Sequence, residues 1–130
     1  MLSAHLSRAK QALSRILSVS RNPRLLAARN DALALAGYSV VSPKHPEDAL
    51  LLFAQESFDA VIIGHSVEGA TREGLIKAIR EARPSVPILF AYAGDPTQEE
   101  PLADVSVDVT AGTTPIVIAL EELLSKAKAE

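Results

Sequence analysis

The sequence predicts an α/β domain built on a parallel sheet, and three features indicate it. Short β-branched runs alternate with longer amphipathic segments, which is the pattern of βαβ units around a sheet that is buried on both faces. Only 4% of the residues are aromatic, so the core must consist mainly of Leu, Ile, Val and Ala. A length of 130 residues suits one domain with a single core.

The β-branched runs predict five strands, at 15–20, 38–42, 59–64, 86–92 and 104–109. The first helix carries clear boundary signals, because Asn22 can cap it, Pro23 suits its first position and Gly37 can end it. Its expected buried stripe consists of Leu25, Leu26, Leu33 and Leu35.

The second helix is expected to start at Pro46 and to end near Glu56. Glu47 and Asp48 place negative charge at the positive end of its dipole. Its expected buried residues are Leu50, Leu51 and Phe53.

Two more helices are expected to open at Thr71 and at Thr114. The expected inward residues are Leu75, Ile76 and Ile79 in the former, and Ile116, Leu120, Leu123 and Leu124 in the latter. Between the last two strands, Pro96 and Pro101 leave room for little more than one helical turn, so the fourth helix slot, 93–103, is predicted to be shortened and mostly loop.

We divide the chain into an N-terminal extension, 1–14, and a domain, 15–130. The extension could form a helix with Leu2, Leu6 and Leu13 on one side, although so short a helix is marginal without a surface to pack on.

Composition and charge exclude several classes of protein. The absence of cysteine excludes disulfides, thiolate nucleophiles and sulfur metal sites. No apolar run reaches the roughly 18 residues that a membrane span needs, and the start lacks a secretory signal, so we expect a cytoplasmic protein without a membrane contact. The first 30 residues carry six basic residues and no acid. A nucleic-acid arm or a transit peptide would also explain this charge, but a solvated helix face is the better interpretation, and we expect no nucleic-acid partner.

Ser66 raises the question of an enzyme, because Gly64, His65 and Ser66 follow an apolar strand as in a hydrolase nucleophile elbow. That elbow needs a small residue two places after the serine, where this chain has Glu68, and no histidine follows Ser66 to act as the base. The histidines, at positions 5, 45 and 65, are too scattered for a metal site, and no phosphate-binding glycine motif occurs. We therefore predict no enzyme activity, no cofactor and no metal.

Four stretches, in order and spacing, resemble the receiver domain of two-component response regulators over about residues 15–126. They are RILSVSRNP, AGYSVVSPKHPEDALLLFAQESFDAVIIG, RPSVPILFAYAG and ADVSVDVT. The resemblance implies a flavodoxin-like, doubly wound five-stranded sheet of strand order 2-1-3-4-5. It also implies a site at the carboxyl ends of the strands, where the order reverses.

The residues that the family uses for phosphorylation are replaced in this chain. Where the resemblance implies an acidic pair for Mg²⁺, the chain has Ser20 and Arg21; where it implies the phospho-accepting aspartate, the chain has Gly64. The switch Thr or Ser corresponds to Tyr92, and the conserved lysine of the family to Val109, or to Thr110 if the register slips by one. The resemblance thus implies a degenerate receiver, or pseudo-receiver, outside the phosphorelay chemistry of its family.

Two functions follow as hypotheses. The first is a phosphorylation-independent signalling module that binds another signalling protein, with a homodimer left open. The second is a small-anion or small-ligand sensor that uses the pocket residues Arg21, Asn22, His65 and Ser66. We expect Arg21 to be a fixed cation held by backbone carbonyls, water or a bound anion, because the resemblance supplies no carboxylate to pair with it.

Overall fold

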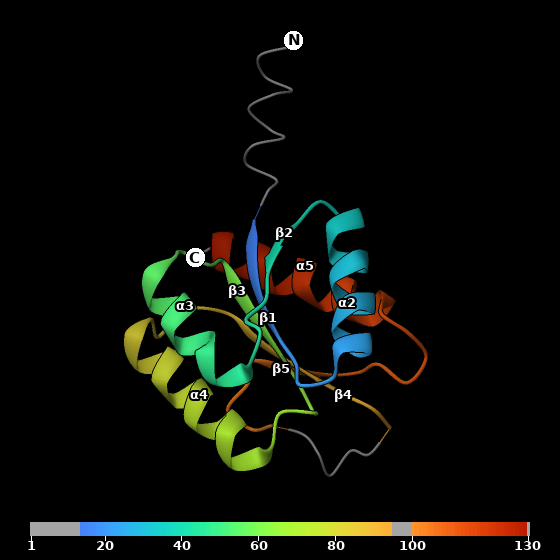
Figure 1. The fold of residues 1–130 in the computed structure, drawn as a ribbon. Helices are drawn as coiled ribbons and strands as arrows, with labels where there is room; N and C mark the ends of the chain where they lie inside the picture. The colour runs from blue at the N-terminus through green and yellow to red at the C-terminus, as the bar shows by residue number, and fades with distance from the viewer. Residues whose placement is uncertain (1–13, 95–99, 130) are drawn as a thin grey trace.

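A computed structural model describes residues 14–94 and 100–129 and contains a five-stranded parallel sheet of order β2-β1-β3-β4-β5 (Figure 1). The strands are β1 (Arg15–Val19), β2 (Ser39–Val41), β3 (Ala60–Gly64), β4 (Ile88–Tyr92) and β5 (Val105–Asp108). Each predicted strand is present and is one or two residues shorter than expected. The flavodoxin-like fold that the sequence predicts is confirmed.

Helices cover both faces of the sheet, with α2 and α5 on one side and α3 and α4 on the other (Figure 1). They are α2 (Pro23–Leu35), α3 (Ala49–Gln55), α4 (Gly69–Ala82) and α5 (Thr114–Ala129), and a 3₁₀ turn, η1 (Pro46–Asp48), leads into α3. The predicted cap of α2 is confirmed: the side chain of Asn22 accepts hydrogen bonds from the backbone amides of Arg24 and Leu25. Gly37 follows the helix with a φ of 98°, a conformation that favours glycine.

Alternation along the strands divides the core into two layers, because successive strand side chains point to opposite faces. In β1, Leu17 and Val19 join the layer under α3 and α4, whereas Ile16 joins the layer under α2 and α5. In β3, Ala60 and Ile62 belong to the α2/α5 layer. The same alternation directs Ser18 and Gly64 toward α2 and α5.

Several predicted helix contacts are wrong, because a helix on the outside of a sheet buries only a narrow stripe. Leu35 is 90% exposed and Leu51 60% exposed, and Leu25 and Leu50 are partly exposed, at 42% and 39%. The predicted inward residues of α4 are confirmed as buried, as are those of α5 except Leu123, which is half-buried. Helix α4 begins at Gly69, two residues before the expected Thr71.

Two of the predicted segments lie partly outside the described residues. Residues 100–104 contain turns and bends between β4 and β5 and no helix, and 95–99, within the 93–103 slot that the sequence predicts to be mostly loop, lie outside the described residues. Residues 1–13 of the predicted extension lie outside them as well. No described helix combines the length and the hydropathy that crossing a membrane would require.

Candidate functional site

The residues predicted to form the degenerate pocket do lie at the carboxyl ends of the strands. Ser20 and Arg21 follow β1, Gly64 is the last residue of β3, Tyr92 is the last of β4, and Val109 follows β5. Because β3 pairs with both β1 and β4, Gly64 lies at the centre of this edge.

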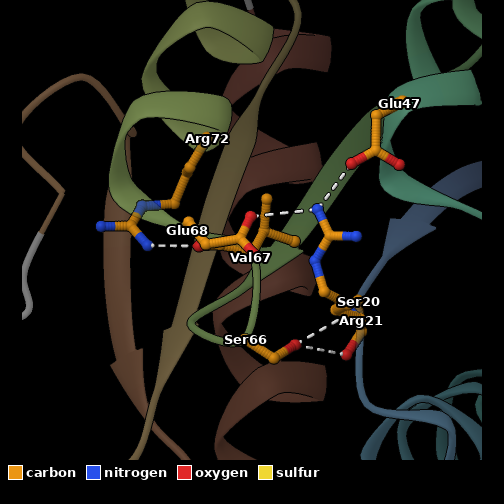
Figure 2. A network of polar contacts seen from close by, with 7 residues as sticks. All are labelled: Ser20, Arg21, Glu47, Ser66, Val67, Glu68 and Arg72. Carbon is orange, nitrogen blue, oxygen red and sulfur yellow. Dashed lines mark hydrogen bonds and ion pairs between the residues drawn. The ribbon is translucent and has the colours of Figure 1, made fainter.

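Ser66 links the loop after β3 to the end of β1. Its Oγ lies 2.9 Å from Ser20 Oγ and accepts a hydrogen bond from the backbone amide of Arg21 at 2.9 Å (Figure 2). Neighbouring His65 does not join this network, since its Nδ1 lies 3.4 Å from the carbonyl oxygen of Ala91. A nucleophilic serine needs a hydrogen bond to a base, whereas the contacts of Ser66 are a hydroxyl and a backbone amide, so it holds two loops together.

Arg21 is paired with two carboxylates, which corrects the expectation that backbone carbonyls, water or a bound anion would hold it. Its Nη2 lies 2.6 Å from Glu47 Oε1 and 3.0 Å from Glu68 Oε2 (Figure 2). The hydrogen bond from Arg21 lowers the pKa of Glu47. Glu47 comes from η1 and Glu68 from the residue before α4, so only the folded chain brings them to Arg21. Because these two carboxylates already neutralise Arg21, its charge gives no reason to expect a bound anion.

Sequence reasoning missed Arg29, which is 4% exposed and reaches from α2 to the end of β1. Its Nη1 donates to Ser18 Oγ and to the carbonyl oxygen of Val19, each at 3.1 Å. A signal was present, because Leu25, Arg29 and Leu33 recur every four residues, so Arg29 continues the stripe that buries Leu33.

The guanidinium of Arg29 fills the space in front of Gly64. A Cβ added at Gly64 would lie 2.7 Å from Arg29 Nη2 and 3.6 Å from Ser20 Oγ. A side chain at position 64 can thus enter only if the guanidinium moves. The family resemblance assigns the phospho-acceptor to position 64. The space that a side chain at this position would need is occupied by the buried guanidinium of Arg29.

A second missed contact ties residue 100 to the loop after β3. The Nε of Arg72 lies 3.0 Å from Glu100 Oε1, and both side chains are largely buried. Arg72 also donates to the carbonyl oxygen of Val67 at 2.8 Å (Figure 2) and lies 4.4 Å from the ring centroid of Phe90. Glu100 therefore connects the 93–103 segment, which the sequence predicts to be mostly loop, to Arg72 of α4.

The pocket does not fit a hard divalent cation. Mg²⁺ prefers carboxylate oxygens in a regular octahedral arrangement, and the pocket residues of the described chain present hydroxyls, a glycine and two arginines. The nearby Glu47 and Glu68 are already bound by Arg21. Across the described parts of the chain, no group of three or more His, Asp or Glu side chains is placed to hold a metal ion.

Comparison with known proteins gives a clear fold and no family assignment by sequence: no protein-family model and no curated protein matches the chain. Solved structures do match. A CheY-like receiver domain from Methanospirillum hungatei has a TM-score of 0.79 at 16% identity, covering 90% of this chain and 98% of its own. The chemotaxis protein CheY4 of Vibrio cholerae has a TM-score of 0.74 at 19% identity, covering 85% and 98%.

A response regulator of Thermotoga maritima, solved in complex with Mg²⁺ and BeF, has a TM-score of 0.76 at 21% identity, and the match covers 85% of this chain and 99% of that one. At these identities the similarity establishes the fold. These structural neighbours are response regulators or their receiver domains, and the chain shares their fold.

Proposed function

We propose that this chain is a degenerate receiver domain that acts as a phosphorylation-independent signalling module, binding another signalling protein in the cytoplasm and catalysing no reaction. The single observation that carries the proposal is the contact between Gly64 and Arg29, whose Nη2 would lie 2.7 Å from a Cβ at position 64.

The chemistry of phosphoryl transfer explains why this contact matters. A carboxylate must attack the phosphoryl group, and a metal ion held by oxygen ligands must neutralise the developing charge. At the matching positions this chain has Gly64 with no side chain, and Ser20 and Arg21 in place of the acidic pair. The pocket therefore lacks both the nucleophile and the metal ligands. In addition, the guanidinium of Arg29 occupies the space in which the side chain of a nucleophile would lie.

The alternative, a ligand sensor centred on Arg21, is the weaker proposal, because Glu47 and Glu68 already neutralise that cation. His65 and Ser66 contact protein groups, and Asn22 caps α2. The receiver fold of the structural neighbours favours an interaction module instead.

Incubation with acetyl phosphate and Mg²⁺ tests the absence of phosphorylation. Intact-mass spectra should show no labile phosphoryl adduct on this protein, while a receiver domain that retains its acceptor aspartate, treated in parallel, should gain one. An adduct that maps to the residues around Gly64 would contradict the proposal.

The interaction itself is tested by capturing partners from the native host with the protein as bait. One bait sample is treated with acetyl phosphate and Mg²⁺ and the other is not, and the affinity of each partner is then measured with purified proteins. We expect the same partner with the same affinity for both samples. A partner that binds only the treated sample would contradict phosphorylation independence, and sedimentation of the purified protein alone would decide whether the partner is a second copy of this chain.

A further inference from the structure

One buried cation, Arg29, has no carboxylate partner within the described part of the chain. Arg15, Arg21, Arg72 and Arg80 each form an ion pair. The 4% exposed Arg29 forms none with any residue that the structure describes. Its Nε is buried without a hydrogen-bond partner, and its Nη2 donates to no described residue.

The charge is costly in this position, and it persists at neutral pH. Burial lowers the pKa of Arg29 from 12.5 to about 10, so the guanidinium is still protonated at pH 7. Buried charges in folded proteins are normally paired and hydrogen-bonded, and here only Nη1 is bonded, to Ser18 and Val19. An anion that accepts a hydrogen bond from Nη2 would neutralise this buried charge and satisfy the free donor.

A recessed cavity of about 170 Å³ lies beside this side chain, between the carboxyl ends of the strands and helices α2 and α5. The cavity has room because three small residues lie on this face of the sheet near the carboxyl ends of the strands. They are Ser20, just after β1, Gly64, the last residue of β3, and Ala91, the last but one of β4. The rest of the wall combines apolar side chains, among them Leu25 from α2 and Ile116 from α5, with the polar side chains of His65, Ser66 and Thr113.

Size and polarity limit the ligand. An apolar protein cavity of roughly 150 Å³ is large enough to hold benzene, so a compact ring or a short branched chain would fit. Among the described residues that line the cavity, Arg29 is the one with a permanent positive charge, so a phosphate dianion would bring one negative charge more than this guanidinium neutralises. A monovalent carboxylate matches both the charge of the guanidinium and its planar donor geometry.

We propose that this cavity is a binding site for a small monocarboxylate with an apolar body, whose carboxylate accepts hydrogen bonds from Arg29 while its apolar part packs between α2 and α5. The site is separate from the protein-interaction role proposed above and does not depend on it.

Benzoate is the probe for this site, with benzamide as a neutral ligand of nearly the same shape and isobutyrate as a smaller carboxylate. Thermal unfolding of the full chain is followed at constant ionic strength, with chloride as the salt control. Benzoate or isobutyrate should raise the melting temperature in a saturable way, since a ligand of the folded state stabilises by mass action, and benzamide should not.

Three variants locate the site. Arg29→Met should weaken carboxylate binding by roughly tenfold to a hundredfold, the value of a hydrogen bond to a charged group. Ala28→Leu keeps the cation and a good helix former but fills the cavity from an exposed position of α2, and it should weaken binding as well. Arg24→Gln, the matched control, removes an exposed arginine of the same helix that does not line this cavity and should leave binding unchanged.

Circular dichroism of each variant separates loss of the site from loss of the fold. If Arg29→Met does not fold, Ala28→Leu still tests the site. No saturable shift with either carboxylate, equal shifts with benzoate and benzamide, or a shift that a folded Arg29→Met or Ala28→Leu variant retains would each overturn the proposal. A shift with inorganic phosphate but with neither carboxylate would overturn it too, in favour of an oxyanion site.

Discussion

Arg21 and Arg29 lie near the end of the same strand and carry the same charge, yet their surroundings give them different roles. Arg21 is at the surface and joins two loops through Glu47 and Glu68. An exposed pair of this kind contributes little to stability. Arg29 lies under α2, contacts β1 and limits what can stand at position 64. The residue that shapes the pocket is thus the buried arginine.

Gly64→Ala should destabilise the fold by about 1 kcal/mol, because the new methyl group would lie 2.7 Å from Arg29 Nη2 and the end of this buried side chain has to shift. Urea unfolding measures the change. In the Arg29→Met variant, Gly64→Ala should lower the free energy of unfolding by at least about 0.5 kcal/mol less than it does in the wild type, since the effects of substitutions at contacting residues are coupled.

Gly74→Ala is the matched control for this substitution. Gly74 lies within α4 with no atom within 4 Å of an added Cβ, so alanine there should stabilise by about 0.5 to 1 kcal/mol. Equal effects at positions 64 and 74 would mean that Arg29 does not restrict Gly64.

The pKa of Glu47 should be below that of an ordinary glutamate and should return toward the ordinary value in Arg21→Gln, because the hydrogen bond from Arg21 is the main cause of the shift. The pair therefore stabilises the fold above the ordinary pKa of glutamate, and this contribution is lost as the pH falls through the lowered pKa. NMR titration of the Glu47 carboxyl measures both values. An unchanged pKa in the variant would contradict the pairing.

At the scale of the element, α2 exposes two of its four leucines, Leu25 and Leu35. Its N-terminus follows the local signals of Asn22 and Pro23, and its buried face is set by the sheet beneath it. Leu33 is fully buried in the α2/α5 layer, whereas Leu35, two residues later, points away and is 90% exposed. Residues two apart on a helix lie on nearly opposite sides, so both could not be buried against one sheet.

Leu33→Ala should destabilise the protein by about 2 to 5 kcal/mol, the cost of a cavity in a packed core. Leu35→Ala should change the free energy of unfolding by no more than about 0.5 kcal/mol, as is usual for an exposed site. Chemical unfolding of the two variants, side by side with the wild type, measures both changes. Similar losses for the two would mean that Leu35 is covered in solution, for example by a second copy of the chain.

At the scale of the whole molecule, the strand order brings the ends of β1, β3 and β4 to one edge and sets the pocket there. This is the place where doubly wound sheets bind ligands. At that edge the chain has hydroxyls, a glycine and arginines.

Mg²⁺ at millimolar concentration should therefore cause no saturable rise in melting temperature and no localised chemical-shift changes around Gly64. A folded-state ligand at a hundred times its Kd would add about 2.7 kcal/mol, which a thermal scan detects easily. NaCl at matched ionic strength serves as the control. Saturable shifts centred on Arg21 and Gly64 would show that Glu47 or Glu68 leaves Arg21 to bind the metal.

The sequence by itself determined the elements and the residues at the strand ends. Periodicity located every strand to within two residues, Asn22 and Pro23 marked the start of α2, and the family resemblance placed Gly64 at the end of β3. These features are local: strand alternation, capping and chain order can be read along the chain without knowing what lies across the sheet.

Only the tertiary structure decided what surrounds those residues. Glu47 and Glu68 are 26 and 47 residues from Arg21 in the chain, and Arg72 meets Glu100 across 28 residues, so no local pattern could pair them. Arg29 lay within a helical stripe, but whether its charge would reach solvent or the end of β1 depended on how α2 packs on the sheet. Long-range contacts decide which charges are paired. Because Arg21 is paired with two carboxylates and Arg29 has no such partner among the described residues, the candidate ligand site is at Arg29 and not at Arg21.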